Sequence, residues 1–231
     1  AEKKRLDGEF ARVSHEIGRL RGQGIDLADV VGGGHGLGSG KPRQGLDPRT
    51  AQVQERDFGN LGNVKVNTFA TCRHHEFVDG VVIPDGGPGG GAAVPISSTG
   101  LTVGDVPDTS GMAWDVIRNG KVASQFSTEL GGVDYASAGH SLLGIHANAG
   151  ITFDLAAIRK ASGSGAMTLS AMAGYGGQEG PRTAELRLYL DGKPVFSRRL
   201  SRKDGAVPVE IAVPESVRFL TVLSTDGGDG Y

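Results

Sequence analysis

Cys72, His74 and His75 form the densest group of potential metal ligands in this 231-residue sequence. If the segment is a strand, Cys72 and His74 share one face and His75 points to the other, because side chains alternate along a strand. Structural zinc is almost always held by four ligands, so a site here needs ligands from elsewhere in the chain. The alternative is a buried and unreactive cysteine, and we favour that interpretation.

Residue types for nucleophilic catalysis are present, but not in a recognisable arrangement. A serine hydrolase usually holds its nucleophile in a Gly-x-Ser-x-Gly turn, and no serine in this sequence has glycine at both positions. His140 beside Ser141, with His146 nearby, is the nearest approach to a triad. Because neither a nucleophile signature nor a paired-carboxylate signature is present, we predict that the chain is not an enzyme.

The glycine run at residues 32–41 is similar to a phosphate-binding loop only in composition. A Walker A loop requires glycine at the position of His35 and serine or threonine at the position of Pro42. The dinucleotide fingerprint fails as well, because Lys41 stands where its third glycine belongs. The formal charge of -2, with both signs interspersed, gives no basic field for a phosphate backbone. We predict neither nucleotide binding nor nucleic-acid binding.

Asp226 and Asp229 lie close to the end of the sequence on backbone that is flanked by glycine. Calcium takes six to eight oxygen ligands, including carboxylates and main-chain carbonyls. Two carboxylates three residues apart on adaptable backbone suit that requirement, although the fixed spacing of an EF-hand is absent. We therefore expect an oxygen-rich turn at Asp226 and Asp229 that is able to take a structural calcium ion, with an ordinary polar β-turn as the alternative.

Aromatic side chains are the residues through which this chain would bind a sugar. An aromatic ring face packs on the apolar C–H face of a pyranose as it does on other apolar surface. Trp114, Tyr135 and Tyr175 lie near glycine-rich or polar segments that are expected to be loops. We predict these three as carbohydrate-binding residues. The alternative for the sole tryptophan, Trp114, is a place in the core.

Strands must position most of these residues. After Phe58, short apolar or alternating runs are separated by turn residues, and the chain holds 39 glycines but a single cysteine, so packing alone supports the fold. Asp191-Gly192 joins two such runs and predicts a hairpin over residues 186–200. The apolar run at 217–223 predicts a strand buried on both faces. A short helix is predicted near residues 155–161.

The first 57 residues have a different pattern. An amphipathic helix is predicted over residues 2–21 and a second, short helix over 25–31, with Asp26 near its start. We expect the first helix to pack on the sandwich or on a neighbouring copy, because an isolated helix of this length is marginal in water. Residues 32–57 are predicted to form an extended connection on the surface, and residues 58–231 the β-sandwich. The apolar face of the first helix consists of Leu6, Phe10, Val13, Ile17 and Leu20.

Several short motifs follow one another from about residue 139 to the end of the sequence. They are LGIHA at 143–147 followed by GITFDL at 150–155, then ELRLYLDG at 185–192 and VRFLTVLSTDGGDG at 217–230. This part resembles the NPCBM family (novel putative carbohydrate-binding module) of galactose-binding-like jelly rolls. The resemblance implies a glycan ligand and gives His146 a packing and hydrogen-bonding role at a strand start. Upstream, residues 26–34 and 77–85 look like segments of exported proteins of planctomycete-type bacteria.

These observations together predict an all-β fold, a jelly-roll-like β-sandwich preceded by a short helical and glycine-rich segment. The predicted function is that of a non-catalytic carbohydrate-binding module of an exported or cell-surface bacterial protein, with a polysaccharide or glycan as partner. The alternative is a structural protein of an extracellular layer or filament, in which the sandwich contacts other copies of itself. No run approaches the roughly 18 apolar residues of a membrane helix. We expect an extracytoplasmic location, with any export signal outside this sequence.

Overall fold

The computed structural model describes residues 24–178 and 180–228 of the chain. These residues form mainly strands, and the helices among them are short. The prediction of an all-β sandwich is therefore confirmed. The helix predicted over residues 2–21 and the predicted calcium ligand Asp229 lie outside the described residues.

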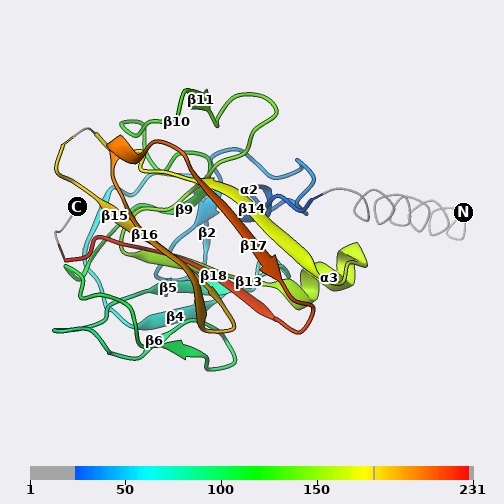
Figure 1. Ribbon diagram of the computed structural model, residues 1–231, viewed down its shortest axis with the longest axis horizontal. Coiled ribbons are helices and arrows are strands. Elements are labelled where there is room, and N and C mark those ends of the chain that lie inside the picture. The colour runs from blue at the N-terminus through cyan, green and yellow to red at the C-terminus, as the bar shows by residue number, and fades with distance from the viewer. Residues whose placement is uncertain (1–23, 179, 229–231) are drawn as a thin grey trace, which may run out of the picture.

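The largest element is a six-stranded antiparallel sheet in the order β16-β15-β18-β13-β5-β4. Strand β18 lies between β15 and β13 and is buried along its whole length, as its apolar sequence predicts (Figure 1). The strands are β4 (Thr68–Thr71), β5 (Val78–Ile83), β13 (Ala149–Asp154), β15 (Ala184–Leu190), β16 (Lys193–Leu200) and β18 (Phe219–Thr225).

The two faces of this sheet belong to two hydrophobic clusters. Val82, Tyr189 and Leu223 pack on one face against a small hairpin, β6 (Val94–Pro95) and β7 (Thr102–Val103). On the other face, side chains such as those of Ile151 and Leu220 belong to the main core. Because residues on both faces are buried, the sheet holds the layers of the molecule together.

The second layer covers the main core. Strands β14 and β17 form a two-stranded ribbon, and a four-stranded sheet has the order β12-β9-β1-β2. The remaining pairs are β3 with β8 and β10 with β11. The strands of these groups are β1 (Gly45–Leu46), β2 (Val53–Gln54), β3 (Asn60–Asn63), β8 (Met112–Trp114), β9 (Ile117–Asn119), β10 (Glu129–Leu130), β11 (Val133–Asp134), β12 (Leu143–Gly144), β14 (Met167–Ala173) and β17 (Val207–Val213).

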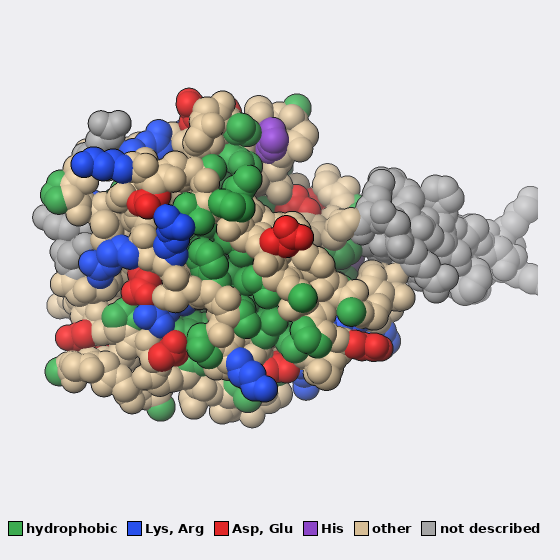
Figure 2. Space-filling view, viewed as in Figure 1, with side chains coloured by type: hydrophobic (Ala, Val, Ile, Leu, Met, Phe, Trp, Pro, Cys, Tyr) green, Lys and Arg blue, Asp and Glu red, His purple; other side chains and the backbone are tan. Residues whose placement is uncertain are grey.

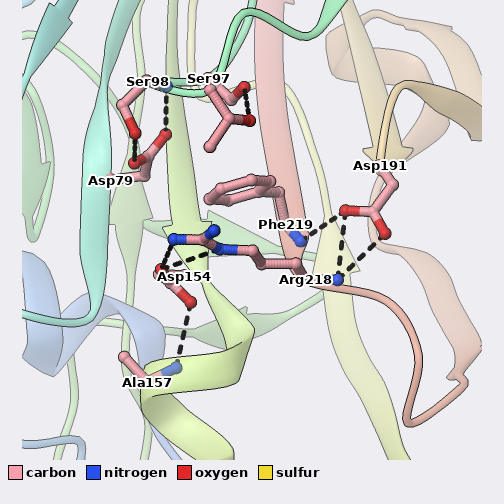
Figure 3. Close-up of polar contacts among 9 residues, drawn as sticks. Asp79, Ser97, Ser98, Asp154, Ala157, Asp191, Arg218 and Phe219 are labelled. Carbon is pink, nitrogen blue, oxygen red and sulfur yellow. Dashed lines mark hydrogen bonds and ion pairs between the residues drawn. The ribbon is translucent and has the colours of Figure 1, made fainter.

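The hairpin between β15 and β16 turns at Asp191 and Gly192, as predicted. Both residues have positive φ, 47° and 79°, which a type I′ turn requires. The Asp191 carboxylate also accepts the amides of Arg218 and Phe219, at 3.0 and 2.8 Å (Figure 3). This carboxylate therefore ties the turn to the start of β18.

Helix α3 (Leu155–Ser162) begins at the same end of the sheet. Asp154 caps it by accepting the amide of Ala157 at 3.0 Å, and the guanidinium of Arg218 lies 3.1 Å from the same carboxylate (Figure 3). Gly163, with φ of 67°, ends the helix in the left-handed conformation. The aspartates at this end are thus engaged in capping and turn formation.

The stretch before residue 58 differs from the extended surface connection that we predicted. The short helix α2 (Leu27–Val31) forms where the sequence predicts it, with Asp26 as its N-cap. Within residues 32–57, Leu46 and Ala51 are buried in the main core, and β1 pairs with both β2 and β9. The prediction of a surface connection is therefore corrected, because this part of the segment packs into the core.

The glycine-rich run at residues 32–41, which we call the Asp29 loop, is folded around one buried carboxylate. Asp29 accepts the amides of Gly36 at 2.7 Å, Leu37 at 3.1 Å and Gly40. A Cβ atom at Gly34 would overlap the Asp29 carboxylate, and one at Gly40 would overlap its main-chain carbonyl. Glycine is therefore required here by close packing of backbone against Asp29.

Candidate functional site

A cavity of about 350 Å³ opens at the side of the second layer. Its wall comes mainly from residues 114–115, 121–130, 142–147 and 174–178, which are loops at the ends of short strands. Four ring side chains line it, and each is half-buried: Trp114, Phe126, His146 and Tyr175. The cavity is thus an aromatic site assembled from segments far apart in the sequence.

His146 lies between two of these rings. Its ring centroid is 5.6 Å from that of Trp114, with an interplanar angle of 31°, and 5.2 Å from that of Phe126. Its Nδ1 lies 3.0 Å from the carbonyl oxygen of Ala147, which can only accept, so Nδ1 donates. Burial lowers the pKa of His146 below its ordinary value, and the imidazole is neutral near pH 7 with Nε2 as an acceptor.

Asp115 is the buried carboxylate of the cavity. It is only 2% exposed, and its Oδ1 accepts the amides of Phe58 at 3.1 Å and Gly59 at 2.7 Å. The exposed side chains of Lys121 and Gln125 stand at the rim. The cavity is therefore lined by a buried carboxylate, two exposed polar side chains and an aromatic wall.

The structure brings two of the three predicted sugar-binding residues together. Trp114 and Tyr175 line the cavity, whereas Tyr135 lies outside its wall, on the turn that follows β11, with its ring 5.3 Å from that of His140. Sequence reasoning missed Phe126 and Asp115. An isolated aromatic residue in the polar segment 123–129 was the signal for Phe126, and nothing in the sequence marked Asp115.

Asp226, the described half of the predicted calcium site, is buried. Its carboxylate accepts the hydroxyl of Ser110, the side-chain amide of Asn148 at 2.9 Å and the amide of Gly228 at 2.9 Å. No group of three or more acidic, histidine or cysteine side chains suited to a metal occurs among residues 24–178 and 180–228. Calcium binding at Asp226 and Asp229 stays a prediction.

The three residues of the Cys72 group have separate surroundings. Cys72 is buried as a free thiol. The Nε2 of His74 lies 3.1 Å from the side-chain oxygen of Gln52. The Nε2 of His75 lies 2.6 Å from the Gly34 carbonyl and therefore donates, while its Nδ1 accepts an amide hydrogen bond. His75 thus joins β5 to the Asp29 loop.

Acid should destabilise the fold through His146 and His75. Burial lowers the pKa of both imidazoles, so the unfolded chain binds protons more readily than the folded chain. The resulting stability is present above the ordinary histidine pKa of about 6.5 and is lost as pH falls below it. Thermal melts from pH 8 to pH 5 measure this loss as a fall in melting temperature.

His146→Gln should make the melting temperature depend less on pH, and the double variant with His75→Gln should reduce that dependence further. His140→Gln, at an exposed position, should leave the dependence unchanged. Equal slopes in all variants would contradict the prediction.

No protein-family model matches this sequence, and no curated protein is significantly similar to it. Two solved structures match part of this chain. One, of the M60 catalytic domain with the CBM51-1 and CBM51-2 domains from Clostridium perfringens ZmpB, is 18% identical over 51% of this chain and 12% of its own, with a TM-score of 0.39. The other, CBM51 from Clostridium perfringens GH95 in complex with methyl-galactose, is 14% identical over 54% of this chain and 83% of its own, with a TM-score of 0.37.

These identities and TM-scores are too low to assign a function to this chain, so its function is inferred from the cavity. The resemblance of the C-terminal part to the NPCBM family, and of the upstream part to exported planctomycete proteins, stays a prediction. No helix in the described residues is long and apolar enough to cross a membrane.

Proposed function

We propose that this chain is a non-catalytic carbohydrate-binding module and that the aromatic cavity is its sugar site. The proposal rests on the observation that Trp114, Tyr175 and Asp115 line the same small cavity. Aromatic side chains that line a cavity suit the apolar face of a sugar. The volume of about 350 Å³ falls at the low end of the roughly 300–1,000 Å³ that is usual for small-molecule sites.

The polar groups of the cavity suit the hydroxyls of a sugar. Sugar hydroxyls donate hydrogen bonds to the Asp115 carboxylate and to Nε2 of the neutral His146. A carboxylate that is already fixed by two backbone amides loses little freedom on binding, which favours affinity. Hydrogen-bond acceptors next to aromatic rings suit a pyranose, which carries hydroxyls around its edge and apolar C–H groups on its faces. The exported or cell-surface location remains part of this proposal.

Replacing Trp114 by alanine should weaken sugar binding about 10- to 100-fold, because a buried aromatic anchor is typically worth 1–3 kcal/mol. Trp114 is the sole tryptophan of the chain, so its fluorescence reports occupancy of the cavity directly. The first probes are the methyl glycosides of galactose, glucose and mannose, followed by a glycan array. Binding is measured by calorimetry for wild type and variant, and by fluorescence for wild type.

The matched control is Val195→Ala, at an exposed position on β16, a strand that contributes nothing to the cavity. It should bind sugars like the wild type. Circular dichroism of Trp114→Ala must match the wild type, so that a loss of binding is not a loss of fold. Unchanged affinity in a folded Trp114→Ala variant would exclude the cavity as the sugar site.

Assembly is the second candidate function, and one surface favours it. Figure 2 shows hydrophobic side chains gathered between β15 and β16 on one side and β14 and β17 on the other. Half-buried hydrophobic residues of these strands include Leu186, Phe196, Met167, Leu169 and Ile211. A second copy of the chain is the partner that we consider. Elution as a large assembly, together with no binding on the array, would favour this function over the first.

A further inference from the structure

The β10–β11 hairpin stands directly beside the cavity. Glu129 pairs with Asp134 across it, and Thr128 and Tyr135 follow as the next opposed residues, with the amide of Tyr135 3.0 Å from the Thr128 carbonyl. Thr128 lines the cavity. Opposed residues of an antiparallel pair have Cβ atoms about 4.5–5.5 Å apart. Tyr135 therefore lies next to the rim, just outside the wall.

Hydrogen bonds fix the backbone around Tyr135. The Asp134 carboxylate accepts the hydroxyl of Thr128 at 2.6 Å and the amide of Ala136 at 3.0 Å, and these hydrogen bonds lower its pKa. The carboxylate is therefore ionised at neutral pH and holds the turn against the cavity wall. The ring of Tyr135 is half-buried and packs edge-on against His140. A ring held in this way is available for stacking at low entropic cost.

Two aromatic surfaces thus flank the rim at Thr128. Trp114 and Tyr175 lie inside the cavity, and Tyr135 lies outside it. A single sugar ring seated in the small cavity reaches only the inner surface. A chain of linked sugars has a second apolar ring face to place on Tyr135 as it leaves the cavity.

We propose, building on the function proposed above, that the site binds an oligosaccharide chain rather than a single terminal sugar. One ring occupies the cavity beside Trp114, and the next crosses the rim at Thr128 and stacks on Tyr135. Tyr135 is then the residue that selects for chain length, and the cavity residues bind the first ring.

The experiment compares the methyl glycosides of galactose, glucose and mannose with the linear tri- and pentasaccharides of the same sugars, by calorimetry. The oligosaccharide should bind about threefold to tenfold tighter than its methyl glycoside, the factor expected for one added aromatic contact. Tyr135→Ala should remove this gain and leave the methyl glycoside unaffected. Trp114→Ala should weaken both ligands.

Two variants control for the hairpin itself. Tyr135→Phe keeps the ring and should retain the gain, and Val133→Ala, at an exposed position of the same hairpin, should behave as wild type. Equal affinity for short and long ligands, or a gain that survives in Tyr135→Ala, would overturn the inference and leave the sugar site intact. Absence of binding to any of these sugars would remove both proposals together.

Discussion

Asp226→Ala should lower the free energy of unfolding by about 3–5 kcal/mol, because each buried donor left without an acceptor costs about 1–3 kcal/mol. The side chain is 2% exposed and accepts from Ser110, Asn148 and Gly228. The amide of Asp226 in turn donates to Asn148 at 2.9 Å. The residue therefore joins the end of β18 to the start of β13 and to the loop before β8. Chemical denaturation of two variants, Asp226→Ala and Asp226→Asn, measures the loss in the free energy of unfolding.

The same experiment separates this structural role from calcium binding. If calcium binds only the folded chain, saturation at about 100 times its dissociation constant adds roughly 2.7 kcal/mol, and Asp226→Ala removes that increment in addition to the hydrogen bonds. Melts are therefore run with calcium and with chelator. A loss of the same size under both conditions, with no metal found by elemental analysis, would refute the calcium prediction. A loss below about 1 kcal/mol would refute the structural role.

The second large effect is expected at Arg118. Its side chain is 1% exposed, pairs with the Asp57 carboxylate and donates to the Arg56 carbonyl at 3.0 Å. Removing one partner of a buried ion pair costs about 3–5 kcal/mol. Asp57 is 37% exposed and also faces Arg43 at 3.5 Å, so Arg118→Ala should cost about 3 kcal/mol, at the lower end of that range. At roughly 2–4 °C per kcal/mol for a chain of this size, the melting temperature reports it clearly.

Two further variants identify what Arg118 contributes. Asp57→Asn keeps a hydrogen-bond acceptor but leaves the buried guanidinium of Arg118 without its counter-charge, so it should cost about as much as Arg118→Ala, roughly 3 kcal/mol. Arg118→Met keeps the length of the side chain and should recover part of the loss, since apolar replacements of buried pairs are often tolerated. A single cooperative transition in every variant is expected, because the strands before residue 58 belong to the core. A separate early transition in Arg118→Ala would indicate that those strands unfold independently.

Local signals predicted much of the sheet. The β15–β16 hairpin follows from Asp191-Gly192, since both positions of its turn need positive φ, and β18 follows from its uninterrupted apolar run. The same reasoning did not predict the structure of residues 32–57. The loop at 32–41 is held by contacts of Asp29 with amides up to eleven residues away, and β1 is held by pairing with the distant β9. Such contacts leave no periodicity in a sequence.

The candidate site was predictable only in part. Aromatic type and nearness to predicted loops pointed to Trp114, Tyr135 and Tyr175, and the structure brings the first and the third to one cavity. Trp114 and Tyr175 are about 60 residues apart in the sequence and come together only in the folded chain. No local sequence pattern predicts such a long-range contact. Asp115 gives no signal at all, because its role arises from its burial and from a positive φ of 51°.

The Asp29 loop is similar to a phosphate-binding loop whose anion is supplied by its own chain. Three amides converge on one carboxylate there, as backbone amides converge on a phosphate in an anion-binding nest. Because this anion is tethered to the same chain, its effective concentration is independent of any solute. Free phosphate has to compete with an intramolecular occupant for the same amides. The loop is thus self-ligated, and its conformation does not depend on the phosphate concentration of its surroundings.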